Sequence, residues 1–204
     1  MRHSCGFATA TRLCLLAALL SPAASLAFPI EDHRQITLES LEAVVRPAPP
    51  GSPPGTKSVY RFTPAAAEQV ANANRDVDVA AKGGWLVFAP AEDHAEDGLV
   101  AESARRVDDL QREIVIGLML ADSTGAAILG PIADRARVLL GEALHTAQDI
   151  HAQPSSDYPV ARAAAVKAGV LVVQTILAQL ESAGAPRSIC AFLGRENCGD
   201  PDAP

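Results

Sequence analysis

The sequence predicts an all-α protein, a single-domain bundle of about five helices. Apolar residues recur at helical spacing along most of the chain. The segments that carry this spacing are bounded by proline, by glycine or by residues that cap helices. The chain also has the size of one ordinary domain once an N-terminal segment is set aside, because 204 residues less 27 leaves 177.

Residues 1–27 have the three parts of an export signal. Arg2 and Arg12 make the segment positive without any acidic residue, and residues 13–20 form an apolar run too short to span a bilayer. A Ser-Leu-Ala sequence ending at Ala27 offers the small residues that a signal peptidase reads. No stop-transfer pattern follows, so we expect cleavage after Ala27, a secreted or periplasmic protein, and no transmembrane segment after cleavage.

The domain that remains, residues 28–204, is acidic. It carries 15 Lys and Arg residues (17 less Arg2 and Arg12) against 24 Asp and Glu residues, a formal charge of −9. Such a surface has no general attraction for nucleic acid or anionic membranes, and we expect no stable nucleic-acid binding. It does not exclude a phosphate substrate, because bound metal ions would reverse the charge inside a cleft.

The first predicted helix begins close to the cleavage site. Asp32 can cap it, with Gln35 three residues later as in a capping box. Apolar residues then recur at roughly helical spacing: Ile36, Leu41, Val44 and Val45. Residues 47–57, PAPPGSPPGTK, form a stiff, proline-rich connection. We interpret them as a loop and not a domain linker, because the few residues before them cannot form a domain.

Proline and glycine delimit the next two predicted helices. The second begins at Thr63-Pro64, a capping hydroxyl followed by proline at the first helical position. It runs to about Ala81, before Gly83-Gly84. The third spans about residues 98–120. Its apolar face is formed by Val107, Leu110, Ile114 and Leu118.

Prolines also mark the last two predicted helices. Pro131 is expected to open the fourth helix and Pro154 to stop it. The fifth begins at Pro159 and can be closed by Gly184. This helix is apolar on most sides, so we expect it at the centre of the bundle.

The four cysteines agree with export. Cys5 and Cys14 leave with the signal, and an even pair, Cys190 and Cys198, remains. In an oxidising compartment we expect these two to form a disulfide that closes a small loop in a tail of residues 185–204. A cysteine-based zinc site would need further ligands nearby, which the sequence does not offer.

Four histidines remain after cleavage: His33, His94, His145 and His151. His145 and Asp149 lie four residues apart on the predicted fourth helix, so the imidazole and the carboxylate share one face and can share one ion. Glu142 lies one turn earlier on the same face. The residues around them are small and apolar, so an ionisable pair there must be paired, bound to metal or placed at a cleft wall.

The string that contains this pair is more specific than the pair itself. Residues 140–149, LGEALHTAQD, resemble the LGxALHTxQD signature of Het-C-like and von Willebrand A-associated N-terminal modules. These modules are similar to the zinc-dependent phospholipases C and to the secreted zinc-dependent single-strand nucleases.

The resemblance extends to three other segments. His33, which an Ile-Thr pair follows three residues later, resembles the first-helix histidine of these proteins. Asn74 and Asp78 resemble their Asn-x-x-x-Asp on the second helix, and His94 resembles their loop histidine. The order of these segments matches from about residue 28 to residue 157.

The resemblance implies a phospholipase C/nuclease-like bundle whose cleft holds up to three zinc ions. It implies one zinc bound by Asp78, His94, His145 and Asp149. It implies another bound by Phe28, His33 and Asp149. Phe28 would bind through the amine that cleavage frees and through its own backbone carbonyl.

Within this implied site, Asp149 would bridge the two ions, because a carboxylate has two oxygens. Two metal ions a few ångströms apart can hold a hydroxide and clamp a phosphodiester, which implies catalytic roles for Asp149 and Asp78. Asp76 is the alternative carboxylate if Asp78 faces away, since residues two positions apart on a helix point about 200° apart.

The sequence departs from the family pattern at the remaining zinc. Gln153 stands where the modules have a histidine, and the Asn-Trp pair that follows it there is absent. The predicted fifth helix, residues 159–183, contains no histidine. Ala95 replaces the phenylalanine after the loop histidine, and the role of His151 stays open. We therefore expect one or two zinc ions and a lost third site.

Three interpretations of function follow. The first is an exported zinc-dependent hydrolase of phosphate esters, with a lipid or nucleotide substrate. The second is a non-catalytic exported binding or interaction protein that retains the fold. The third is an unrelated exported helical bundle. The low aromatic content, 4%, offers few rings on which bases could stack and disfavours a nuclease relative to the other phosphate-ester hydrolases.

Overall fold

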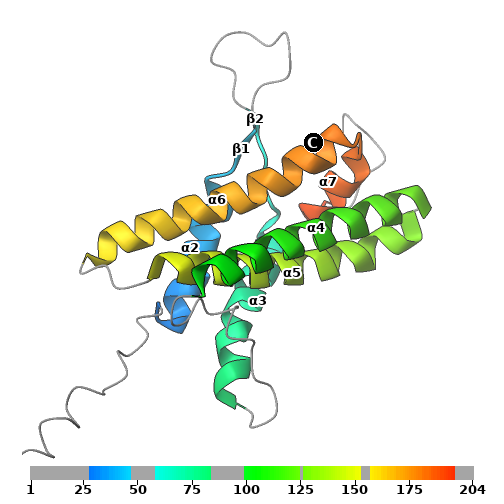
Figure 1. Ribbon diagram of the computed structural model, residues 1–204. Helices are drawn as coiled ribbons and strands as arrows, with labels where there is room; N and C mark the ends of the chain where they lie inside the picture. Colours follow the sequence, from blue (N-terminus) through cyan, green and yellow to red (C-terminus); the bar gives the residue numbers. More distant parts are fainter. Residues whose placement is uncertain (1–27, 47–57, 84–98, 125, 153–156, 196–204) are drawn as a thin grey trace, which may run out of the picture.

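The computed structural model describes residues 28–46, 58–83, 99–124, 126–152 and 157–195. Within them it has six helices and one pair of two-residue strands (Figure 1). The helices are α2 (Ile30–Glu42), α3 (Pro64–Gly83), α4 (Val100–Thr124), α5 (Ala126–Ala152), α6 (Tyr158–Ser182) and α7 (Pro186–Phe192). The strands are β1 (Val45–Arg46) and β2 (Ser58–Val59). The prediction of an all-α single-domain bundle is confirmed.

Several predicted features lie outside the described residues. These are the export signal (residues 1–27), the proline-rich loop (residues 47–57) and the loop that contains His94. The strands β1 and β2, which bracket residues 47–57, are antiparallel, with Val45 opposite Val59. The sequence pattern did not predict this strand pair.

Helix α5 occupies the centre of the bundle, because it contacts all five other helices. Its buried positions include small residues that let its neighbours approach: Ala133, Ala136, Gly141, Ala143 and Ala147. The prediction that the fifth helix, α6, would be central is wrong. Although α6 is apolar on most sides, Val160 and Leu171 are 60% and 54% exposed. Apolar composition alone did not reveal how many neighbours a helix has.

Two predicted helix starts differ from the observed ones. Helix α5 begins at Ala126, so Pro131 lies inside the helix and not at its start. Pro131 is the sixth residue of α5, beyond the first four residues whose N–H groups have no partner within a helix, and the helix continues through it. In α2, Pro29 occupies the N-cap and no side chain caps the helix, so the predicted capping box of Asp32 and Gln35 is wrong. Asp32 instead accepts a hydrogen bond from the Tyr158 hydroxyl.

The main hydrophobic core joins α4, α5, α6 and α7. Its largest fully buried side chains are Leu110, Ile114, Leu118, Leu140, Leu144, Ile176, Leu177, Leu180 and Phe192. A second cluster lies at the start of α2 and comprises Phe28, Ile36, Ala152, Ala161 and Ala165. Each large apolar side chain in these clusters contributes about 1.5–3 kcal/mol when it leaves water.

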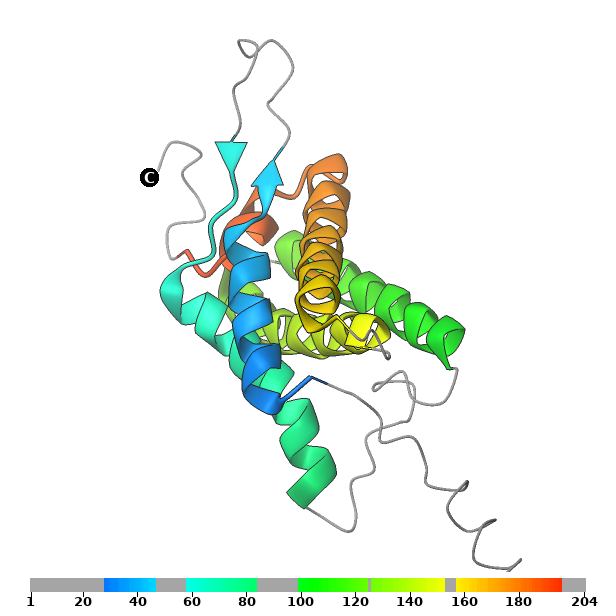
Figure 2. The same cartoon turned by 90° about the vertical axis from the view of Figure 1, so that its left-hand side faces the viewer.

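Helices α2 and α3 lie beside each other and cross the α5–α6 pair (Figure 2). Two glycines allow these crossings to be close. A methyl group on Gly141 of α5 would lie 2.6 Å from the Cβ of Ala73 and 2.7 Å from the backbone nitrogen of Asn74 in α3. One on Gly169 of α6 would lie 2.4 Å from Oγ of Ser40 in α2. The backbones of α3 and α5 therefore meet directly beside Asn74.

The C-terminal tail contains a short helix, α7, that the sequence pattern did not predict. The buried Arg137 of α5 holds its end, because Nη1 donates to the backbone oxygens of Ala191 at 2.7 Å and Phe192 at 3.2 Å. Cys190 of α7 is disulfide-bonded, and its expected partner, Cys198, lies outside the described residues.

One helix of the described part, α6, is long and apolar enough to cross a membrane by length and composition alone. A core helix of a soluble bundle meets the same criterion. One face of α6 is buried against the bundle at Ala165, Val173, Ile176 and Leu180. The absence of a membrane-spanning segment after cleavage stays a prediction.

Candidate metal site

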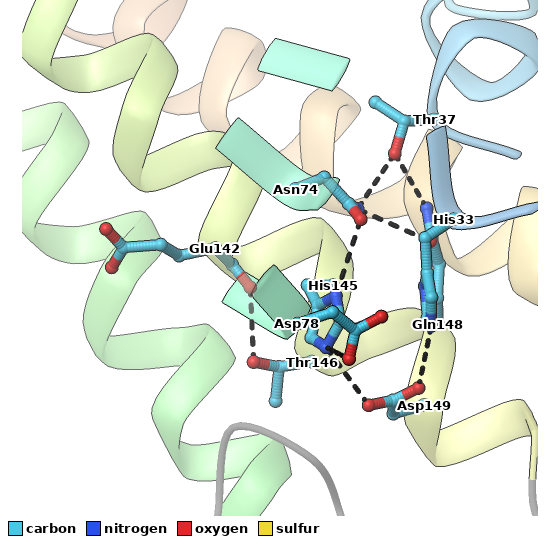
Figure 3. A network of polar contacts seen from close by, with 9 residues as sticks. All are labelled: His33, Thr37, Asn74, Asp78, Glu142, His145, Thr146, Gln148 and Asp149. Carbon is cyan, nitrogen blue, oxygen red and sulfur yellow. Dashed lines mark hydrogen bonds and ion pairs between the residues drawn. The ribbon is translucent and has the colours of Figure 1, made fainter. Parts of the chain in front are cut away.

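Four ionisable side chains converge where α2, α3 and α5 meet (Figure 3). Asp149 lies between two imidazoles: its Oδ1 is 3.2 Å from Nε2 of His33, and its Oδ2 is 3.3 Å from Nε2 of His145. Asp78 approaches from α3, with Oδ1 at 3.8 Å from Nε2 of His145. The two imidazole rings are 4.4 Å apart between centroids and tilted by 30°. Side chains separated by more than 100 positions in the sequence thus share one point.

The helical geometry of α5 and α3 explains three of these positions. His145 and Asp149 are one turn apart on α5, so they share a face as predicted. On α3 the side chain of Asp78 is 10% exposed, whereas that of Asp76 is 60% exposed and pairs with Arg75 at 2.7 Å. Residues two positions apart on a helix point about 200° apart. Asp78 therefore belongs to the cluster, and the alternative, Asp76, does not.

The site is buried and carries two carboxylates. His33 and His145 are fully buried, and Asp149 and Asp78 are 2% and 7% exposed as residues. With both imidazoles neutral, the two carboxylates give the cluster a formal charge of −2. Burying such charge is costly unless an opposite charge compensates it, and a divalent cation would do so.

The negative charge of the cluster affects the pKa of His33. Burial by itself lowers the pKa of the imidazole, but the adjacent Asp149 carboxylate, with help from Gln148 and Asp78, raises the pKa above its ordinary value. The buried Nε2 of His33 lies 3.2 Å from Oδ1 of Asp149. A buried nitrogen held in this way is a suitable donor to a metal ion.

The spacing of the donor atoms also fits a metal ion. One ligand atom from each of His33, Asp78 and His145 lies within 4.8 Å of the other two. Two ligands of a tetrahedral zinc, each about 2.1 Å from it, would be roughly 3.4 Å apart. Asp149 lies 3.2 and 3.3 Å from the two imidazoles, and Asp78 lies 3.8 Å from His145, which is close to that value. These residues could therefore hold a metal ion with little rearrangement.

A second layer of polar side chains surrounds the imidazoles. Nδ1 of His33 lies 2.8 Å from Oε1 of Gln148, and Nδ1 of His145 lies 3.4 Å from Oδ1 of Asn74. Both amides also contact the hydroxyl of Thr37. All three second-layer residues are fully buried. The sequence pattern did not predict the role of these three residues, because nothing local in the sequence shows that they are buried together.

Phe28 lies against the site through its ring. The ring packs edge-on against His33 with centroids 5.7 Å apart, and against Tyr158 with centroids 5.9 Å apart. Its role as a zinc ligand through its backbone amine and carbonyl stays a prediction. His94, the fourth ligand predicted for the first zinc, lies outside the described residues, as do Ala95 and Gln153.

Two other predicted polar residues are not part of the cluster. Glu142, expected on the face of His145, directs its carboxylate away from the site (Figure 3). It lies 3.6 Å from Arg106 of α4 and 4.0 Å from Arg135. A three-residue step leaves an offset of about 60° around a helix, which turns Glu142 toward α4. His151 is exposed near the end of α5.

The chain thus combines an all-α bundle with a buried His/Asp cluster that could hold a metal ion. Comparison with known proteins finds no matching family model, no matching curated protein and no matching solved structure. The family resemblance of residues 140–149 remains an interpretation of the sequence.

Proposed function

We propose that the protein is an exported zinc-dependent phosphoesterase-like protein that hydrolyses phosphate esters. One observation carries the proposal: the two oxygens of the buried Asp149 face Nε2 atoms of two different histidines at 3.2 and 3.3 Å. This arrangement suits a carboxylate that serves metal ions on both of its sides. It is also the arrangement that the resemblance implies for a bridging aspartate.

The donor set favours zinc. Imidazole nitrogens and carboxylate oxygens are common zinc ligands, and three protein ligands plus one further position are typical of catalytic zinc sites. When bound, zinc lowers the pKa of a coordinated water to about 7 and polarises a phosphoryl oxygen. His33, His145, Asp78 and Asp149 would hold one or two such ions.

The protein side chains would contribute position and charge. Asp149 and Asp78 concentrate negative charge that only bound cations make compatible with a phosphate ester. Asp78 has the most exposed side chain of the four, at 10%, and so marks the side from which a ligand can approach. The substrate class that follows is a phosphate ester, either lipid or nucleotide.

One observation favours a second candidate, a non-catalytic exported binding or interaction protein. The side chains of His33 and His145 are completely buried, and that of Asp149 is 1% exposed. Structural zinc sites are closed, whereas catalytic sites keep a position open to water and substrate. A closed site would make the metal a structural clamp for α2, α3 and α5.

Metal analysis and hydrolysis assays on the secreted protein test the proposal. We expect bound zinc, and zinc-dependent hydrolysis of bis(p-nitrophenyl) phosphate or of phosphatidylcholine. His145→Ala should lower the zinc content and abolish hydrolysis, while the matched control His151→Ala, at an exposed position of the same helix, should retain both. Zinc without hydrolysis of either substrate would support the non-catalytic candidate. A protein that binds no zinc would contradict both uses of the site.

A further inference from the structure

We infer that Thr37 is a positioning residue that orients both metal-binding histidines through the amides of Asn74 and Gln148. In this arrangement Nδ1 of each imidazole keeps its proton and Nε2 of each is reserved for the metal. The inference rests on the proposed zinc site, but its first consequence, the location of the imidazole protons, can be measured without metal.

Four fully buried contacts connect the three polar residues to the histidines (Figure 3). Nδ2 of Asn74 donates to Oγ1 of Thr37 at 2.8 Å, and Nε2 of Gln148 donates to the same oxygen at 3.0 Å. The oxygens of the two amides then face the imidazoles, at 2.8 Å for His33 and 3.4 Å for His145. The amides also touch each other, because Nδ2 of Asn74 lies 3.3 Å from Oε1 of Gln148.

Counting donors and acceptors shows why the amides cannot turn over. A hydroxyl has one hydrogen to donate, so at most one amide can present its oxygen to Thr37. Turning one amide alone would place two oxygens, or two NH₂ groups, against each other at the 3.3 Å contact. Turning both would leave two oxygens competing for one hydroxyl hydrogen. Only the orientation in which both nitrogens donate to Thr37 satisfies all the contacts among Thr37 and the two amides.

This orientation determines the protonation of the imidazoles. Because Gln148 and Asn74 present acceptors, Nδ1 of His33 and of His145 must be the donors. A neutral imidazole has a single N–H, so its other nitrogen, Nε2, then carries the lone pair that a metal ion needs. The Nε2 atoms are the ones that face Asp149. Partners on the second nitrogen of metal-binding histidines commonly fix the ring in this way.

Two substitutions at position 37 separate hydrogen bonding from packing. Thr37→Val keeps the shape of the side chain but removes the hydroxyl, so the two amides can turn over together and offer NH₂ to Nδ1 of both imidazoles. We expect it to weaken zinc binding by up to about 10-fold, the lower end of the effect of losing a direct partner of a metal ligand, because Thr37 contacts the histidines only through the amides. Thr37→Ser keeps the hydroxyl, and we expect it to bind zinc nearly as the unaltered protein does.

Nitrogen-15 NMR of histidine-labelled protein locates the protons directly. In the unaltered protein and in Thr37→Ser, Nδ1 of His33 and His145 should be protonated with or without zinc. In metal-free Thr37→Val, at a pH where both imidazoles are neutral, part of the proton population should move to Nε2. Gln148→Leu provides a second variant if Thr37→Val does not fold. It removes the acceptor of His33 directly, so the His33 signals should change more than those of His145, whose partner Asn74 keeps its contact with Thr37.

The outcomes distinguish the two proposals. Two results would overturn the role of Thr37 and leave the zinc site standing. One is zinc bound through Nδ1 of either histidine. The other is equal zinc affinity and equal proton positions in Thr37→Val and Thr37→Ser. Protonated Nδ1 atoms that depend on the Thr37 hydroxyl, in a protein that binds no zinc, would leave the role of Thr37 in place and remove the proposed function.

Discussion

Replacing Gly141 by alanine would push α3 away from α5 where both helices present residues of the site. The added methyl group would lie 2.6 Å from Cβ of Ala73 and 2.7 Å from two backbone atoms, the nitrogen of Asn74 and the oxygen of Val70. Carbon atoms are best separated by about 3.5–4.0 Å, so α3 would have to move by roughly 1 Å. Backbone atoms cannot rotate out of the way as a flexible side chain can.

The expected loss of stability is modest and calculable. Overpacking of this kind costs about 1–3 kcal/mol, while alanine favours a helix over glycine by about 1 kcal/mol. We therefore expect a net destabilisation of up to about 2 kcal/mol, which lowers the Tm by up to roughly 8 °C for a domain of this size. Zinc affinity should fall as well, because the same displacement carries Asn74 and Asp78 away from His145.

Thermal unfolding by circular dichroism, with Gly117→Ala as the control, measures the effect. A methyl group at Gly117, also in a helix interior, would make only an ordinary 3.7 Å contact with Ile132. It should therefore stabilise the protein by up to about 1 kcal/mol through helix propensity. If Gly141→Ala proves as stable as Gly117→Ala, the two helices do not meet at Gly141, and the account of how α3 reaches the site is refuted.

Two further substitutions test the bonds that hold the bundle. Arg137→Met should destabilise the domain by about 1–3 kcal/mol in urea unfolding, because the backbone oxygens at the end of α7 and the side-chain oxygen of Gln69 lose their donor. An unchanged midpoint would contradict this role. Arg162 beside Glu39 lowers the pKa of that carboxyl, so the pair stabilises the fold above the ordinary glutamate pKa, and the effect is lost as pH falls through the lowered value. Because the pair is exposed, Glu39→Gln should change stability at neutral pH by less than about 1 kcal/mol and remove this small acid dependence; a larger loss would show that the pair is more than a surface contact.

The sequence predicted the helices better than their arrangement. Thr63-Pro64 and Pro159 carry local information about helix starts, and both helices begin within a residue of the expected place. The central position of α5 depends instead on which faces meet, and its small residues do not reveal this in a single sequence. Helix α7 is short, and its end is held by a side chain from α5, so local patterns give little sign of it.

As with the fold, only the part of the site that depends on local sequence spacing could be predicted from the sequence. The pairing of His145 with Asp149 follows from their four-residue spacing alone. That His33 and Asp78 join them rested on the family resemblance, because no local rule brings α2 and α3 to α5. The Thr37 network could not be predicted from the pattern, since amides on helices usually face water and Asn74 is buried by the packing of α3 against α2 and α5.

The wide sequence separation of the donors links metal binding to folding. An unfolded chain could offer a metal ion only the local pair His145 and Asp149, whereas His33 lies more than 100 residues away and reaches the site only when α2 has docked. A metal that binds the folded state alone stabilises it by about 4 kcal/mol at a free concentration 1,000 times its Kd. Metal binding at this site would therefore act as a late folding step, and the metal content of a preparation would report the fraction of molecules that have completed it.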